Sequence, residues 1–221
     1  KDNAAFLNNP RPVVFSFNEA IRFSRAATGS NMLVDSLVVF DAPVHPKYRK
    51  LTQEWFSLRN LARLEDELRT LAAATVDRML ENGPGEVDFV KEVSGPYPLR
   101  VVMQILGVPP ADEFRMQMLT QQLFGGQDKD LSGSGLDQMT PEQVVQIVAG
   151  AVKTFEDYFG ALAEERRAHP TGDVASVIAN ALVDGQPLPP RDMAGYYIIV
   201  ATAGHDTTSA STAGAMQALA R

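Results

Sequence analysis

One stretch decides how this sequence is interpreted: Tyr196-Tyr197-Ile198-Ile199-Val200-Ala201-Thr202-Ala203-Gly204-His205-Asp206-Thr207-Thr208-Ser209. No proline follows Pro190, so the end of the chain predicts one final helix of about 30 residues, about 45 Å long. An apolar run opens this helix, and a dense polar cluster follows. Such a cluster destabilises the middle of a helix. Glycine there is less favourable than alanine by about 1 kcal/mol, and a buried Asp or Thr needs hydrogen-bond partners.

Three consequences follow from the polar cluster. Ala203 and Gly204 leave a concavity in which a diatomic molecule or a flat ring could lie close to the backbone. Thr207 or Thr208 could donate to a carbonyl one turn earlier, which would loosen the helical hydrogen bonds. Asp206 next to Thr207 offers a carboxylate and a hydroxyl in series, as a proton relay requires.

The same cluster also fits a second interpretation, in which two helices meet. Gly204 would end the first helix, and Asp206 or Thr207 would cap the second. A capping box would need Glu or Gln three residues further on, where Ser209 and Ala210 stand. These residues alone leave both interpretations open.

Helical periodicity covers most of the remaining chain from His45 onward. One helix is predicted around an apolar stripe that ends at 82–85 and consists of Leu61, Leu64, Leu68, Leu71, Ala72, Thr75 and Met79. Further helices are predicted over Pro98–Leu106, Glu113–Phe124, Thr140–Ala168 and Asp173–Leu182, with an extended piece at Glu86–Phe89 and a turn at 184–187. Residues 1–40 are expected to be loop with a short helix near Asn18–Arg25, and Gly125–Met139 a mobile surface loop. No strand alternation is evident, so the predicted fold is mainly α, one domain over 1–221.

Composition narrows the functional classes. The chain has 221 residues, and its 20 Lys and Arg against 27 Asp and Glu give a net charge of −7, which argues against a nucleic-acid binder. The absence of cysteine excludes disulfides and thiolate metal ligands within these residues. No apolar run reaches the roughly 20 residues of a membrane span, and no signal peptide is evident, so a soluble cytoplasmic protein is expected.

A second motif lies near the front, in Asp41-Ala42-Pro43-Val44-His45-Pro46-Lys47-Tyr48-Arg49. His45 and Arg49 are four residues apart and project from one face of a helix. A guanidinium at a helix start can bind a carboxylate through two parallel hydrogen bonds. Taken alone, the pattern fits equally a surface helix end with a solvated Arg and a capping His.

Together the two motifs resemble those of the cytochrome P450 (haem-thiolate) monooxygenases. The stretch 203–208 resembles the oxygen-activating signature, small-Gly-x-acid-Thr, of their long central helix, and 41–49 resembles the segment that binds the haem propionates. The order and spacing of the helices between them also match. The resemblance implies the central part of the cytochrome P450 fold, and within the family it is greatest to the soluble bacterial members that hydroxylate terpineol-like monoterpenes.

The resemblance also implies roles for residues. Thr207 is expected to donate a hydrogen bond to bound dioxygen and Asp206 to relay protons, while His45, Arg49, Ala203 and Gly204 contact heme b. Ile199, Ala203 and Thr207, at four-residue spacing, are expected to face the substrate together with Val38 from an apolar loop at 31–40, although a plain core stripe would look the same. His205, at the variable position of the signature, is expected to be structural.

The expected activity is hydroxylation of a monoterpene or aromatic hydrocarbon with dioxygen, and the electrons would come from NAD(P)H through a ferredoxin reductase and a ferredoxin. A monomer is expected, with Lys47, Lys50 and Arg59 on the ferredoxin side. No axial cysteine is present, so no metal ligand is predicted here, and the chain is expected to be an internal piece of a longer protein, inactive alone. The alternative is an all-helical module that binds a small ligand without redox chemistry.

Overall fold

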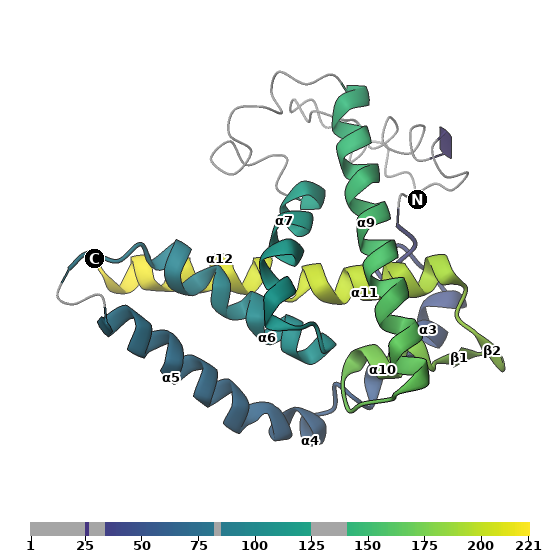
Figure 1. Ribbon diagram of the computed structural model, residues 1–221, viewed down its shortest axis with the longest axis horizontal. Helices are drawn as coiled ribbons and strands as arrows, with labels where there is room; N and C mark the ends of the chain where they lie inside the picture. Colours follow the sequence, from purple (N-terminus) through teal and green to yellow (C-terminus); the bar gives the residue numbers. More distant parts are fainter. Residues whose placement is uncertain (1–24, 27–33, 82–84, 125–140) are drawn as a thin grey trace.

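The computed structural model describes residues 25–26, 34–81, 85–124 and 141–221 (Figure 1). The loop predicted at Gly125–Met139 and all of the helix predicted near Asn18–Arg25 except its last residue lie outside the described residues. In the described part, the chain is mainly helical, as predicted. No helix in that part is long and apolar enough to cross a membrane.

The elements follow one order along the part of the chain that the structure describes. They are α3 (Val44–Gln53), α4 (Leu58–Leu61), the 3-10 turn η1 (Ala62–Leu64), α5 (Glu65–Glu81), the π-helical turn η2 (Val90–Ser94), α6 (Pro96–Leu106), the 3-10 turn η3 (Pro110–Asp112), α7 (Glu113–Phe124), α9 (Pro141–Ala168), α10 (Val174–Ala179), β1 (Leu182–Val183), β2 (Gln186–Pro187), α11 (Pro190–Ala203) and α12 (Asp206–Leu219). The long helix predicted to follow a cap at Thr140, with Pro141 in its first turn, begins at Pro141 and ends at Ala168 as predicted, before the break at His169 and Pro170.

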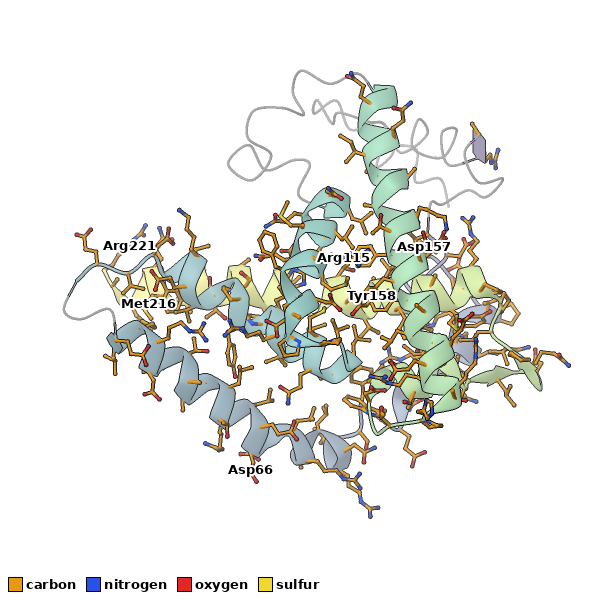
Figure 2. All side chains as sticks on the ribbon, viewed as in Figure 1. Asp66, Arg115, Asp157, Tyr158, Met216 and Arg221 are labelled. Carbon is orange, nitrogen blue, oxygen red and sulfur yellow. The ribbon has the colours of Figure 1, made fainter. Side chains whose placement is uncertain are left out.

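The core lies where α9 packs against α7, α10 and α11. Phe155 and Phe159 of α9 stack at 5.8 Å, and Phe159 stacks in turn on Tyr197 of α11 at 4.9 Å. All three rings are buried, and burial of such a side chain stabilises the fold by about 2–3 kcal/mol. Figure 2 shows Tyr158 and Arg115 beside this core, where the guanidinium of Arg115 lies 5.5 Å from the ring centroid.

A buried ion pair joins the ends of three helices. Arg166 near the end of α9 is only 8% exposed, and its guanidinium donates to Asp173 at 2.6 Å and to the carbonyl of Gly107 at 3.0 Å. Asp173 caps α10 by accepting from the amide of Ser176, and Gly107 ends α6 in the left-handed region with φ 71°. Desolvation alone would raise the pKa of Asp173, but the hydrogen bonds from Arg166 and Ser176 lower it below its usual range.

Four local predictions were wrong. The helix predicted over Asp173–Leu182 ends at Ala179, and Leu182–Val183 instead pairs antiparallel with Gln186–Pro187 across a turn with positive φ at Asp184 and Gly185. Val90–Ser94 forms a π-helical turn, and α6 starts two residues before Pro98. The stripe that starts at Leu61 spans α4, η1 and α5 rather than one helix. The final helix is interrupted between Ala203 and Asp206.

One side of the molecule is open. The long helix α5 packs mainly on α6 and η1, and Thr75 is its one buried residue, so Val76 and Leu80 stand exposed. No residue of α12 is buried either. Figure 2 shows Met216 and Arg221 at the end of α12 and Asp66 at the start of α5, all on this open side.

Candidate functional site

The site begins at the junction of α11 and α12. Gly204 (φ −79°, ψ −23°) and His205 (φ −103°, ψ −41°) keep right-handed helical angles, and no side chain caps α12. Figure 1 accordingly shows α12 continuing in the direction of α11. The junction is therefore a local distortion within one helical path, and neither Asp206 nor Thr207 acts as the cap that the two-helix interpretation required.

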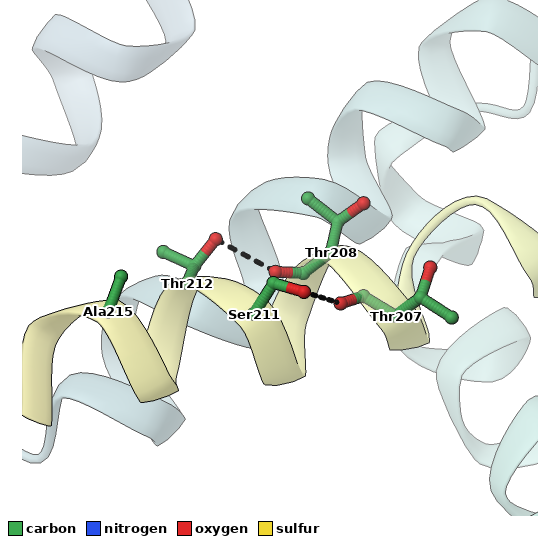
Figure 3. A pocket seen from close by; sticks show the side chains of 5 residues that line it. All are labelled: Thr207, Thr208, Ser211, Thr212 and Ala215. Carbon is green, nitrogen blue, oxygen red and sulfur yellow. Dashed lines mark hydrogen bonds between the residues drawn. The ribbon is translucent and has the colours of Figure 1, made fainter. Parts of the chain in front are cut away.

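Hydroxyl groups bond to the helix backbone at this distortion. Thr207 donates to the carbonyl of Ala203 at 3.3 Å, and Thr208 donates to that of Gly204 at 3.1 Å, as the sequence predicted. Such bonds compete with the helical amides for the same carbonyls and bend the helix. Ser211 and Thr212 repeat the pattern one turn later, with bonds of 2.8 Å (Figure 3).

These hydroxyls border a groove on the exposed face of α12. Its volume is about 420 Å³, and its lining residues are Thr207, Thr208, Ser211, Thr212 and Ala215. Figure 3 shows the five side chains along successive turns of the helix. The predicted concavity at Ala203 and Gly204 is not where this groove lies, since it begins one turn further along the chain.

The opposite face of the junction is buried. His205 is buried, and its Nδ1 lies 3.2 Å from the carbonyl of Ala201. A Cβ on Gly204 would stand 2.7 Å from Cγ2 of Val102 on α6, so it is packing against α6 that requires glycine at this position. His205 is thus placed as a structural residue, whereas Asp206 and Thr207 remain exposed.

The helix α3, which carries the second motif, packs against the first half of α11. The Tyr48 hydroxyl donates to Asp192, and the Tyr196 hydroxyl bonds with the hydroxyl of Thr52 at 2.8 Å and donates to the carbonyl of Tyr48 at 3.1 Å. Burial, aided by the hydrogen bond and charge of Asp192, raises the pKa of Tyr48 well above its usual range, so this phenol stays neutral and donates. The sequence alone gave no sign of these four residues, because each contact joins positions more than 140 apart.

This contact places the two motifs on one side of the helix. Tyr196 touches α3, and Ala203 and Thr207 follow it by seven and eleven residues, close to two and three turns of 3.6 residues. All three therefore project from nearly the same face. Ala203 lies about 10 Å further along the axis at 1.5 Å per residue, on the exposed part of that face.

His45 and Arg49 lie at the exposed side of α3. The imidazole of His45 is half-buried and the guanidinium of Arg49 is exposed, and neither forms an ion pair with a described residue. Arg49 is close enough to Tyr196 for its charge to oppose the rise in the pKa of that phenol, which burial causes. Of the predicted substrate residues, Ile199 is half-buried on the stripe and Val38 is 73% exposed.

Comparison with known proteins shows to which protein family the chain belongs. It is 39% identical over 205 residues to "Cytochrome P450-terp" from a Pseudomonas species, a match that covers 92% of this chain and 47% of that protein. The crystal structure of CYP108D1 from Novosphingobium aromaticivorans superposes with a TM-score of 0.79 at 58% identity, and covers all of this chain and 50% of that one. The chain belongs to the cytochrome P450 family. No family model matches it.

Other P450 relatives are more distant. "Linalool 8-monooxygenase" from Pseudomonas putida is 30% identical over 171 residues, which cover 77% of this chain and 39% of that protein. The chain spans about half the length of the curated relatives it matches. The predicted membership of the cytochrome P450 family and the predicted mainly α fold are thereby confirmed. Nothing in the comparisons favours a ligand-binding module without redox chemistry.

A P450 implies haem, and the residues present suit it. His45 and Arg49 offer two nitrogen donor groups on one face of α3, and Arg49 has no competing carboxylate among the described residues. Ala203 presents the smallest side chain on the exposed stripe, which leaves the backbone accessible to a flat ring. No group of three His, Asp or Glu in the described residues could hold a metal ion.

Proposed function

We propose that the full-length protein is a haem-dependent monooxygenase that inserts one oxygen atom of dioxygen into a small hydrophobic substrate, a monoterpene or an aromatic hydrocarbon. The names of P450-terp and linalool 8-monooxygenase support this substrate class. The observation that carries the proposal is the pair of exposed residues Asp206 and Thr207 at the start of α12, with Thr207 on the continuation of the α11 face that contacts α3. Haem bound between these regions would supply the activation of dioxygen.

His45 and Arg49 would hold the two propionates. A guanidinium grips a carboxylate through two parallel hydrogen bonds, each stronger than a neutral one. The packing of Tyr48 on Asp192 and of Thr52 on Tyr196 fixes α3 relative to α11, and thus fixes both donors relative to Ala203. This packing supports the proposal that the propionate end and the oxygen end belong to one site.

Thr207 would deliver a proton to dioxygen. Its bond to the Ala203 carbonyl is long at 3.3 Å, so the hydroxyl is only weakly engaged and can rotate to donate elsewhere. The neighbouring Asp206 has a side chain that is 67% exposed, with its Oδ1 3.9 Å from Nε2 of His205. Asp206 can therefore take protons from water and pass them to the hydroxyl next to it.

Electrons would come from NAD(P)H through a ferredoxin reductase and a ferredoxin. Lys50 and Arg59 are exposed and suit an acidic partner, whereas Lys47 already pairs with Asp184 at 2.5 Å. A monomeric state and a cytoplasmic location complete the proposal.

Thr207→Ala in the full-length, haem-loaded enzyme tests the proton role. Dioxygen and two electrons should still be consumed, but without directed proton delivery they should leave as hydrogen peroxide. Product formed per electron pair should then fall by at least an order of magnitude, because a positioned proton donor contributes about 10²-fold or more. Oxygen uptake, peroxide and product are measured together.

Thr154→Ala is the matched control. Thr154 makes the same kind of bond, to the carbonyl of Gly150 at 2.8 Å, on an exposed face of α9. It should leave coupling unchanged. If Thr207→Ala turned electrons into product as efficiently as the control, the proton role of Thr207 would be wrong.

A further inference from the structure

The segment that carries Val38 approaches α11 unusually closely. A Cβ on Gly195 would stand 1.8 Å from the backbone oxygen of Asp35 and 3.2 Å from Cγ1 of Val34. Backbone atoms cannot move aside as a flexible side chain can. Gly195 lies inside α11, where glycine is less favourable than alanine by about 1 kcal/mol, so the close approach is what requires it.

An ion pair secures the same point. The Asp35 carboxylate accepts from Nε of Arg191, and both side chains are about two-thirds buried or more. Arg191 and Gly195 are four residues apart, on one face of α11. Asp35 is thereby held on two successive turns, by its backbone at Gly195 and by its carboxylate at Arg191.

The other end of the segment is fixed to α3. The ring of Phe40 lies 4.9 Å from that of Tyr48, and Tyr48 is itself bonded to Asp192 of α11. Between the two ends, Ser36 is buried and its carbonyl accepts from the amide of Val39 at 3.0 Å. Residues 35–40 therefore form a short strap from α11 to α3, with Val38 exposed on it.

The strap is anchored on the predicted substrate stripe. Gly195 and Ile199 lie four residues apart on one face of α11, and each further step of four residues to Ala203 and Thr207 turns the stripe by about 40°. Gly195 precedes Ile199 by about 6 Å and Ala203 by about 12 Å along the axis. The strap therefore meets α11 one turn before Ile199, the nearest member of the predicted substrate stripe.

We propose that Gly195 and the Asp35–Arg191 pair are positioning residues that set the height of the strap above α11, and so decide how large an apolar substrate the site accepts. The proposal rests on the proposed function, because it assumes that the stripe faces the substrate. Larger side chains at position 195, or loss of the ion pair, raise or release the strap. The affinity for bulky substrates then rises relative to the affinity for small ones.

The experiment uses the full-length, haem-loaded enzyme and a panel of monoterpenes and arenes of graded size. The variants are Gly195→Ala, Asp35→Asn and the charge exchange Asp35→Arg with Arg191→Asp. Dissociation constants come from the absorption change on titration, and kcat and KM are measured for the largest and smallest members. Hydrogen exchange of the Val39 amide reports the strap independently of activity.

Both single variants should change the ratio of dissociation constants for large and small compounds by about threefold to tenfold, with the effect in KM rather than kcat, because an interaction of this kind contributes on the order of 1 kcal/mol. Exchange at Val39 should accelerate, and the charge exchange should restore the ratio in part. Gly150→Ala and Asp157→Asn are matched controls on α9: a Cβ at 150 meets nothing within 4 Å, and Asp157 only pairs with Lys153 on the surface. Neither should change the ratio.

Size selection identical to the parent enzyme in Asp35→Asn, with unchanged exchange at Val39, would overturn the proposal even if Gly195→Ala failed to fold. Failure of the proposed function would look different. In that case the parent enzyme itself would show no absorption change with any apolar compound and no carbon monoxide complex after reduction.

Discussion

Gly107 is a position at which one added methyl group should damage the fold in two separate ways. Its φ of 71° is in the left-handed region, and a Cβ there would stand 2.0 Å from Oδ2 of Asp173 and 2.8 Å from Nη2 of Arg166. Gly107→Ala therefore strains the backbone and pushes apart an ion pair that is nearly inaccessible to water.

The size of the effect follows from these two costs. A non-glycine residue in the left-handed conformation costs about 1–2 kcal/mol. Loss of a charge-assisted hydrogen bond between Arg166 and Asp173 costs about 1.5–3 kcal/mol. Alanine regains about 0.4–1 kcal/mol by restricting the unfolded chain. The free energy of unfolding should fall by about 2–4 kcal/mol.

Urea unfolding of the full-length protein, followed by far-ultraviolet circular dichroism, measures this loss, with Gly150→Ala as the control that meets no neighbour. A double-mutant cycle with Asp173→Ala separates the costs, because only the backbone strain should remain when the carboxylate is gone. A Gly107→Ala protein as stable as the control, or equally destabilised with and without Asp173, would refute the reasoning.

Two further predictions concern charge. Arg49→Gln in the full-length enzyme should weaken haem retention by about tenfold to a hundredfold, the value of a charge-assisted hydrogen bond, whereas Arg69→Gln on exposed α5 should not; haem content after dialysis against a haem acceptor measures both. Asp173 has a lowered pKa in the folded state, so its stabilising effect is complete above the usual carboxyl pKa of about 3.9 and is lost as the pH falls towards the folded value. The difference in unfolding free energy between the parent and Asp173→Asn should accordingly shrink from pH about 6 to pH about 3, and a constant difference would contradict the assignment.

Much of the fold was predictable because its signals are local. Gly107 ends α6, and the break at His169 and Pro170 ends α9, as glycine and proline chemistry requires. The hairpin at Asp184 and Gly185 was missed although Asp-Gly is a strong turn signal, because its strands have only two residues each and show no alternation. The interruption at Gly204 was one of two interpretations of the polar cluster, and the sequence could not decide between them because the backbone angles there remain helical.

The contacts between distant parts of the chain could not be predicted from the sequence, for a different reason. Gly195 stands in an apolar run, where the sequence shows only a glycine that disfavours a helix. The residue whose backbone requires this glycine, Asp35, is 160 residues away. The same is true of Tyr48 and Asp192. His45 and Arg49 were found by resemblance, but what fixes them relative to α11 is packing between residues with no motif of their own.

These contacts support the proposal that proton delivery takes place where α11 gives way to α12. Upstream of Ala203 the helix is held by α3, by α9 and by the strap, and eight of its residues are buried. Downstream, no residue of α12 is buried, and hydroxyl bonds replace tight helical packing. A proton-delivering hydroxyl needs both conditions, a fixed position and room to rotate. Thr207 lies on the first helical turn that offers both a fixed backbone position and room for the hydroxyl to rotate.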